Sequence, residues 1–204
     1  MFDSTIRPHI DPVLDRVGQA LADKGISANH VTLAGFFIGC LAALAIGAQY
    51  FFIGLVLLLV SRICDGLDGS VARASAPTDF GGFLDIVLDF AFYGLIPLAF
   101  IVADPQANAV AGGMLLLTFY VNGASFLAYA LMAEKRGIDP ADRGKKSLLY
   151  TTGLTEATET IVVFVLFCLF PGWFPAIATV FAVMVIYTTI SRIMLARGSF
   201  GDAA

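Results

Sequence analysis

Long apolar segments constrain the fold of this chain more than any other feature. Six runs of membrane-spanning length can be drawn, at about residues 31–48, 50–73, 79–103, 108–133, 147–170 and 174–196. Because lipid offers no partner for unpaired backbone groups, we expect these runs to be helices. A transmembrane barrel would show shorter, alternating segments separated by turns, and these runs are continuous instead.

The composition agrees with a membrane protein. Of the 204 residues, 58% are hydrophobic and 14% are charged, whereas roughly a quarter of the residues in a soluble domain are charged. The sequence therefore predicts an all-α membrane protein of one domain over residues 1–204. Its six transmembrane helices would lie within residues 31–196.

The basic residues are distributed unevenly along the chain. On the six-span prediction all 12 Lys and Arg residues fall on one side: in the N-terminal segment, near the second-to-third and fourth-to-fifth connections, and at the C-terminal end. The other connections carry none. Cytoplasmic loops are enriched in Lys and Arg, so we expect a multi-pass protein of the cell (inner) membrane. Both termini and the connection between the second and third spans would face the cytoplasm.

An amphipathic helix is expected before the first span, at residues 10–24. Its apolar residues share one helical face, namely Ile10, Val13, Leu14, Val17, Ala20 and Leu21. This pattern is typical of a helix that lies in the membrane interface. An ordinary solvated helix fits less well, because the rest of the chain is membrane.

Four aspartates lie within the second and third spans, at Asp65, Asp68, Asp85 and Asp89. An ionised carboxylate at membrane depth costs at least a few kcal/mol, and like charges close together repel. A structural ion-pair network would need buried cations, and only two arginines are near in sequence, which cannot balance four carboxylates. The pattern therefore favours a divalent metal site.

Helical spacing places these carboxylates on facing sides of a hairpin, because a short turn near Pro77 joins the two spans. At about 1.5 Å of rise per residue, they form two layers. Asp68 and Asp85 lie nearer the turn, and Asp65 and Asp89 lie deeper. Four carboxylates in two layers resemble a cage for two metal ions, and oxygen-only ligands favour Mg²⁺ or Mn²⁺ over zinc.

Small residues alternate with the aspartates, at Gly66, Gly69, Ala72 and Gly82. Small residues commonly allow close packing of membrane helices. They would also let a bulky substrate approach the backbone between the carboxylates. The alternation with aspartate favours substrate approach.

The same residues carry a family resemblance. The pattern Asp-x-x-Asp-Gly-x-x-Ala-Arg, eight residues, then Gly-x-x-x-Asp-x-x-x-Asp covers residues 65–89. It resembles the signature of the CDP-alcohol phosphotransferase family at every fixed position, and Asn29-x-x-Thr32 is similar too. The resemblance implies six transmembrane helices, a cavity open to the cytoplasm and a homodimer. It also implies that a CDP-linked donor gives its phosphoryl-alcohol unit to a hydroxyl, releasing CMP.

The resemblance further implies residue roles. Asp65, Asp68 and Asp85 would bind the metal ions, and Asp89 would both ligate metal and act as the catalytic general base. The expected contacts to the nucleotide and donor are Asn29, Thr32, Gly66, Gly69, Ala72, Arg73 and Gly82.

The acceptor alcohol is less clearly indicated. Lys146 and Arg192, at the entrance to the fifth span and near the cytoplasmic end of the sixth, would suit a phosphorylated acceptor such as glycerol 3-phosphate. Glu156 and Glu159 would instead suit polyol hydroxyls, an amine or a third cation. The preferred function is transfer of a phosphatidyl group from CDP-diacylglycerol to a small alcohol, phosphorylated or not, in phospholipid biosynthesis.

Two alternatives remain open. The stretch Gly153-Leu154-Thr155-Glu156 is loosely similar to aminoalcohol phosphotransferases, which move phosphocholine or phosphoethanolamine from a CDP derivative to diacylglycerol. A divalent-cation transporter would also carry acids within its spans. Acids of an ion pathway should follow the depth of the membrane, however, and these cluster toward one side. We expect lipids and a second copy as partners, and no nucleic acid.

Overall fold

The computed structural model describes residues 3–137, 155 and 157–201. This part of the chain is helical and contains no strand, which confirms the all-α prediction. In chain order the elements are α1 (Asp3–Asp23), α2 (Ala28–Gly47), α3 (Phe51–Ala74), α4 (Asp79–Ala103), α5 (Pro105–Lys135), α8 (Ala157–Leu169), the 3₁₀ turn η1 (Pro171–Trp173) and α9 (Phe174–Phe200).

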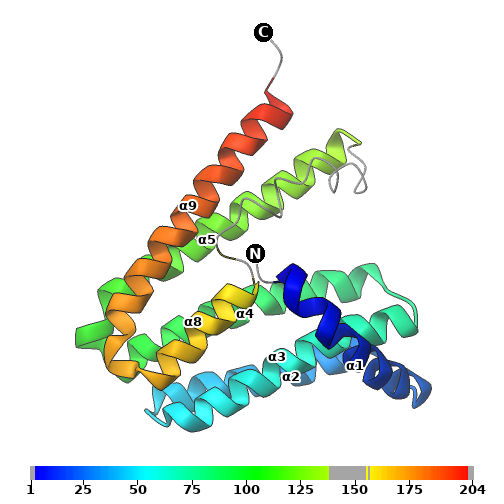
Figure 1. The fold of residues 1–204 in the computed structure, drawn as a ribbon, viewed down its shortest axis with the longest axis horizontal. Coiled ribbons are helices and arrows are strands. Elements are labelled where there is room, and N and C mark those ends of the chain that lie inside the picture. Colours follow the sequence, from blue (N-terminus) through cyan, green and yellow to red (C-terminus); the bar gives the residue numbers. More distant parts are fainter. Residues whose placement is uncertain (1–2, 138–154, 156, 202–204) are drawn as a thin grey trace.

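Two groups of helices make up the fold (Figure 1). In one group α2 packs against both α3 and α4, and α1 crosses α3. In the other, α5 and α9 lie side by side, and α5 also contacts α4. The C-terminal ends of α5 and α9 diverge from the first group, and α8 contacts α3. Only residues 75–78 separate the end of α3 from the start of α4, as expected, but these two helices pack mainly against α2 rather than against each other.

Side-chain caps mark where two helices begin. Thr78 precedes α4, and its Oγ1 accepts a hydrogen bond of 3.1 Å from the backbone nitrogen of Gly81. Asp104 does the same for α5 through the nitrogen of Ala107, at 3.1 Å. Such caps satisfy donors that a helix start leaves unpaired. The Thr78 cap therefore fixes the residue at which α4 begins after the short α3–α4 connection.

Aromatic side chains fill the core where the two groups meet. Phe92 and Phe100 of α4 are fully buried, with Phe164 and Phe167 of α8 and Phe174 of α9. The rings of Phe100 and Phe174 stack with their centroids 4.9 Å apart. Aromatic pairs at such distances add to the burial of their area, so this cluster holds α4, α8 and α9 together.

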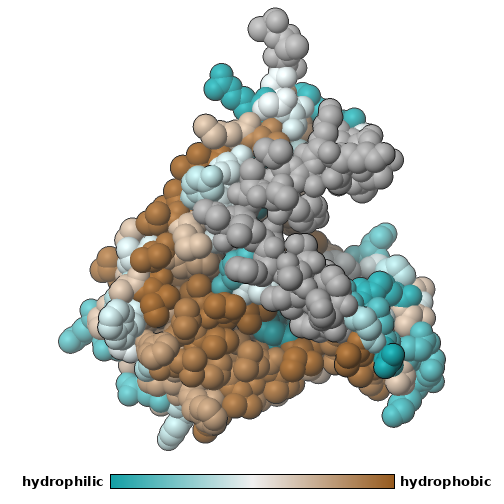
Figure 2. All heavy atoms as spheres, in the orientation of Figure 1, coloured by the Kyte–Doolittle hydropathy of each residue, from teal (hydrophilic) through white to brown (hydrophobic). Residues whose placement is uncertain are grey.

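Large apolar side chains also cover much of the outer surface. Phe52 is 75% exposed and Val110 is 78% exposed. Figure 2 shows apolar side chains over the middle of the face in view and hydrophilic ones toward its ends. A soluble monomer rarely exposes apolar patches of such extent, so this surface is suited to lipid.

Four stretches are long and apolar enough to cross a membrane, by length and composition: α2, α4, α5 and residues 171–200. Helix α3 is 24 residues long but carries the charged residues of the site. Only part of the predicted fifth span is described, as the 13 residues of α8. The structure therefore supports four of the six expected spans, and the other two stay predictions.

Helix α1 differs from the expected interfacial helix in where it begins. It begins at Asp3 rather than near residue 10. Gly18 is buried against Ser70 of α3, whereas Val13 and Val17 of the predicted apolar face are 59% and 43% exposed. Part of α1 therefore packs on protein, and its placement in the membrane interface stays a prediction.

Candidate metal and nucleotide site

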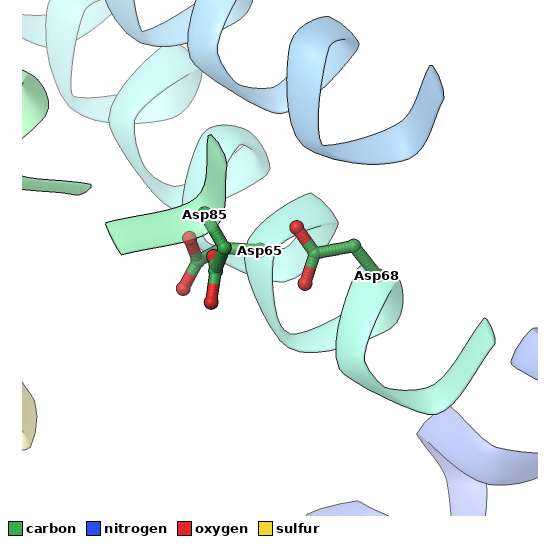
Figure 3. A group of neighbouring side chains, drawn as sticks. All are labelled: Asp65, Asp68 and Asp85. Carbon is green, nitrogen blue, oxygen red and sulfur yellow. The ribbon is translucent and has the colours of Figure 1, made fainter. Parts of the chain in front are cut away.

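Three of the four aspartates come together between α3 and α4. One carboxylate oxygen each of Asp65, Asp68 and Asp85 lies within 4.8 Å of the others, and Figure 3 shows their side chains directed into a common region. We call these residues the three-carboxylate group. Oxygens that share one Mg²⁺ ion lie at most about 4.2 Å apart, because each metal–oxygen bond is about 2.1 Å. Small side-chain movements would bring all three within reach of one ion.

Asp68 gives an independent indication that a cation fits here. Its side chain is only 6% exposed, and its buried Oδ2 has no hydrogen-bond partner among the described residues. A buried polar atom left unpaired costs about 1–3 kcal/mol, and more when it is charged. A hard divalent cation is the natural partner for such an oxygen.

Asp89 is held differently from the other aspartates. Its Oδ1 accepts a hydrogen bond of 2.8 Å from Nη1 of Arg62, and the same Nη1 lies 3.3 Å from Oδ1 of Asp65. Asp89 thus shares a layer with Asp65, as the spacing predicts, but lies outside the three-carboxylate group. Its role as a further metal ligand stays a prediction.

Arg62 is the residue of this site to which sequence reasoning assigned no role. It precedes Asp65 by one helical turn, and its guanidinium carbon lies 3.6 Å from the ring centroid of Phe92. The signal was its offset of three residues from Asp65, which places both on one face of α3. Its side chain is only 8% exposed.

A cavity of about 220 Å³ lies beside the α3–α4 connection, and we call it the hairpin cavity. It is formed by the start of α2, the end of α3 and the start of α4. Five of the expected donor-binding residues line it, together with Asp68 and Asp85: Asn29, Thr32, Gly69, Ala72 and Gly82. The three-carboxylate group therefore supplies part of the wall of a space that the expected nucleotide residues surround.

A smaller cavity of about 10 Å³ lies deeper. It is lined by Arg62, Asp65, Asp85 and Asp89, and both Thr32 and Asp85 line the two cavities. This volume is about that needed for one water-sized particle. The carboxylates therefore border a cavity that has room for one water molecule or one metal ion.

The glycines of the motif serve two different purposes. A Cβ at Gly82 would meet no atom within 4 Å, and one at Gly69 would meet only Nη1 of Arg73, at 3.5 Å. A Cβ at Gly66 would instead lie 3.1 Å from Cδ1 of Leu14 on α1. Close helix packing thus accounts for Gly66, whereas Gly69 and Gly82 leave open space in the hairpin cavity.

Arg73 lies outside the residues that line the hairpin cavity. Its Nη2 donates hydrogen bonds to Oδ1 of Asp15, at 2.7 Å, and to Oγ of Ser70, at 2.9 Å. The bond from Arg73 holds the pKa of Asp15 below its ordinary value. Since Nη1 lies against Gly69, the guanidinium is next to the cavity, and its contact with the nucleotide stays a prediction.

The expected acceptor-binding residues are only partly described. Lys146 and Glu156 lie outside the described residues, and Glu159 is half-buried in the first turn of α8. Arg192 of α9 donates from Nη1 to the Asn122 carbonyl oxygen at 2.9 Å, to its Oδ1 at 2.8 Å and to Oγ of Ser125 at 2.8 Å. Arg192 therefore joins α9 to α5, and a role toward the acceptor stays a prediction.

Comparison with known proteins decides the family. The sequence model of the CDP-alcohol phosphatidyltransferase family matches residues 25–194. The chain belongs to this family. The phosphatidyltransferase is 47% identical over 193 residues to inner membrane protein YnjF of Escherichia coli K12, which covers 95% of this chain and 94% of that protein.

Two further matches bear on the fold and the reaction. The phosphatidyltransferase is 29% identical over 199 residues to archaetidylinositol phosphate synthase of Methanothermobacter thermautotrophicus, covering 95% of this chain and 91% of that one. It shares its fold with a crystal structure of Mycobacterium tuberculosis phosphatidylinositol phosphate synthase with CDP-DAG bound. The TM-score is 0.74 at 20% identity, over 95% of this chain and 98% of the other.

Family membership confirms the predicted reaction class. The chain is a membrane-bound transferase of phospholipid biosynthesis, a CDP-alcohol phosphatidyltransferase. Enzymes of this family use divalent metals, in agreement with the three-carboxylate group and the unpaired oxygen of Asp68. The alternative of a cation transporter is set aside by the same finding.

Proposed function

We propose that this phosphatidyltransferase moves a phosphatidyl group from CDP-diacylglycerol to a hydroxyl of a phosphorylated polyol, releasing CMP. The observation that carries the proposal is the three-carboxylate group, of which Asp68 and Asp85 line the hairpin cavity. The names of two similar proteins, archaetidylinositol phosphate synthase and phosphatidylinositol phosphate synthase, describe products with a phosphorylated inositol headgroup. Inositol phosphate and glycerol 3-phosphate are therefore the first acceptors to test.

The hairpin cavity is proposed to receive the nucleotide of the donor. Asn29 and Thr32, in the first turns of α2, offer polar groups at one wall. Gly69 and Gly82 leave room for the diphosphate to approach the helix backbones. Arg73, at the edge of the cavity, would place a positive charge beside the negatively charged donor phosphates.

The three-carboxylate group is proposed to hold Mg²⁺ or Mn²⁺. The bound metal would stabilise the negative charge that develops on the transferred phosphoryl group and on the departing CMP. Asp65 and Asp68 reach the site from α3, and Asp85 reaches it from α4. Their placement on two helices ties metal binding to the integrity of the hairpin. Asp89 as a further ligand, and the expected second ion, belong to this proposal.

Asp89 is proposed to accept the proton of the acceptor hydroxyl. A general base must come within hydrogen-bond reach of the proton that it removes. Asp89 borders the small cavity beside Asp65 and Asp85, and its Oδ1 is fixed by Arg62. Its other oxygen is the one available to a hydroxyl.

The acceptor phosphate is proposed to bind near Arg192. Its guanidinium is held in place by Asn122 and Ser125, and a fixed guanidinium suits recognition of a phosphate. Lys146 would add a second positive charge from outside the described residues. Glu159 would accept hydrogen bonds from the polyol.

The topology and assembly expected from the sequence complete the proposal. All 12 Lys and Arg residues fall on one side of a six-span arrangement, which would place the hairpin cavity and both termini in the cytoplasm. The enzyme would work as a homodimer.

The test is CMP release by purified enzyme in lipid nanodiscs with CDP-diacylglycerol and Mg²⁺ or Mn²⁺. The panel contains inositol 1-phosphate, glycerol 3-phosphate, inositol, glycerol and ethanolamine. We expect turnover with a phosphorylated polyol and none without metal. Turnover only with CDP-choline or CDP-ethanolamine and diacylglycerol would instead establish the aminoalcohol phosphotransferase alternative.

A further inference from the structure

Helices α4 and α5 meet through two matched contacts, each of which places a large side chain of α4 against a glycine of α5. At Gly123 an added Cβ would overlap Cε1 of Phe90 and lie 2.8 Å from its Cζ. At Gly112 an added Cβ would lie 2.5 Å from Cγ1 of Ile101. Eleven residues, or about three helical turns, separate the two contacts on each helix. The antiparallel pair is therefore held in one register at two levels.

The two contacts lie at different distances from the connection between the helices. Ile101 and Gly112 are close to residue 104, where α4 passes into α5. Phe90 and Gly123 lie farther out, on the side where the C-terminal ends of α5 and α9 diverge from the other helices (Figure 1). Phe90 is therefore the spacer between α4 and α5 on the diverging side.

On α4 the spacer follows directly after the carboxylates of the site. Asp89 immediately precedes Phe90, and Asp85 lies one helical turn before Asp89. Asp85 belongs to the three-carboxylate group, and both aspartates border the small cavity. A movement of α4 at Phe90 would therefore move these carboxylates with it.

On α5 the same level holds Arg192 of α9. Asn122 accepts hydrogen bonds from Nη1 of Arg192 at its carbonyl oxygen and at Oδ1, and Ser125 accepts one at Oγ. The guanidinium carbon also lies 5.6 Å from the ring centroid of Phe126. Because Gly123 lies within this segment, the thickness of the side chain that rests on it sets how far Arg192 lies from α4.

The core of the protein does not depend on Phe90. Its side chain is 41% exposed, whereas Phe92 is fully buried and packs against Phe164 of α8. A phenylalanine in a helix has few allowed rotamers, and the missing Cβ at Gly123 lets the edge of the ring rest on the α5 backbone. A change at Phe90 should therefore alter the spacing of α4 and α5 and leave the fold in place.

We propose that Phe90 is a positioning residue that sets the separation between the carboxylates of α4 and Arg192, and thereby the size of the phosphorylated acceptor that the enzyme accepts. This inference rests on the proposed function, in which Arg192 binds the acceptor phosphate. Phe90 acts through the placement of these groups and is not expected to touch the substrate.

The first test measures the spacing without turnover. Spin labels are attached to α4 at Val87, which is 45% exposed, and to α5 at Leu131, which is 64% exposed, after replacement of the three native cysteines by alanine. Electron–electron resonance in nanodiscs should give a distance about 2 Å shorter in Phe90→Leu and longer in Gly123→Ala, since contact side chains set interaxial distances over about this range. An unchanged distance in both variants would overturn the proposal.

The second test measures acceptor preference. In Phe90→Leu the ratio of kcat/KM for inositol 1-phosphate to that for glycerol 3-phosphate should fall about 10- to 100-fold, because a displacement of about 1 Å can cost a factor of about 100 and the larger acceptor needs the wider spacing. KM for CDP-diacylglycerol should not change. Where the wild type turns over only one of the two acceptors, kcat/KM for that acceptor should fall by the same factor. An unchanged preference, or a parallel rise in KM for the donor, would overturn the proposal.

A paired substitution separates spacing from general damage. In Gly123→Ala combined with Phe90→Leu, the smaller side chain leaves room for the added methyl group, so the label distance and the acceptor preference should return to within about twofold of the wild type. Independent, additive effects of the two substitutions would overturn the proposal.

Gly54→Ala is the matched control for a crowded glycine. Its Cβ would overlap Ile46 of α2, away from the contact between α4 and α5, so it should lower Tm and leave the label distance and the acceptor preference unchanged. A change of preference in this variant equal to that in Phe90→Leu would also overturn the proposal. If the wild type turns over no phosphorylated polyol, the proposed function fails, and the label distances still decide whether Phe90 sets the spacing of the two helices.

Discussion

Arg73 on α3 donates a hydrogen bond from Nη2 to Oδ1 of Asp15 on α1, at 2.7 Å. The contact lies near the crossing of the two helices, where a Cβ at Gly18 would come within 2.7 Å of Cβ of Ser70. With Nη2 engaged, Nη1 is directed toward Gly69 at the hairpin cavity. Asp15 of α1 therefore fixes the position of the Arg73 guanidinium beside the hairpin cavity.

Asp15→Asn should raise KM for CDP-diacylglycerol severalfold and change kcat little. The variant loses the charged partner of Arg73, so the guanidinium is held less firmly beside the donor phosphates. Steady-state CMP release at varied donor concentration measures the effect. Asp23→Asn is the control, because Asp23 on the same helix bonds to Gln19 within α1. Equal KM values for the Asp15 variant and the wild type would show that α1 does not influence the donor site.

Acid should weaken the contact between α1 and α3. The hydrogen bond from Arg73 holds the pKa of Asp15 below its ordinary value of 3.8. A lowered pKa means that the bond contributes fully above pH 3.8 and is lost as the pH falls through the lowered value. Spin labels on exposed positions of α1 and α3 should report greater separation only in strongly acidic buffer. The same labels on Asp15→Asn should report no such transition.

Asp68→Asn should abolish Mn²⁺ binding and raise Tm of the metal-free protein. The unpaired Oδ2 of Asp68 is buried, so neutralising this side chain relieves repulsion from Asp65 and Asp85 when no metal is bound. Calorimetry with and without Mn²⁺ separates the two effects. Asp79→Asn, at an exposed carboxylate in the first turn of α4, should alter neither quantity. An unchanged Mn²⁺ titration in Asp68→Asn would exclude this residue as a ligand.

Much of the metal site could be predicted from the sequence, because helical periodicity fixes which residues share a face. Asp65 and Asp68 are three residues apart, and a short turn forces Asp85 to face them. The layers follow from counting residues to the turn. The pairing of Asp89 with Arg62 could not be obtained in this way, because it depends on how α4 is rotated about its own axis and on the position of Phe92.

The N-terminal helix shows a second limit of sequence reasoning. An amphipathic pattern indicates that one face is apolar, but it does not say whether lipid or protein covers that face. In the structure Gly18 permits close approach to Ser70, while Val13 and Val17 stay exposed. Nor could the sequence alone tell which of the four small residues (three glycines and Ala72) serve helix packing and which leave space for a ligand, as the contact of Gly66 with Leu14 shows.

Gly82→Ala should raise KM for the donor without harming the fold. A Cβ at Gly82 meets no protein atom within 4 Å, and Ala in a helix is favoured over Gly by about 1 kcal/mol, so Tm should rise slightly. Any loss of donor affinity would then report a collision with the ligand. Gly94→Ala is matched, since it lies on the same helix, also meets no atom and does not line the hairpin cavity. If both variants keep the wild-type KM, the donor does not approach Gly82.

Arg192→Gln should raise KM for a phosphorylated acceptor and leave KM for the donor unchanged. The side chain also joins α9 to Asn122 and Ser125 of α5, so Tm should fall by a few degrees. This structural effect acts on both substrates, whereas loss of a phosphate contact acts on the acceptor alone. Arg197→Gln, in the last turn of α9, controls for a general loss of positive charge. The decisive comparison is between inositol 1-phosphate and inositol, because a variant that loses the preference for the phosphate would identify Arg192 as its binding partner. A parallel rise in the KM values of donor and acceptor would instead limit Arg192 to holding α5 and α9 together.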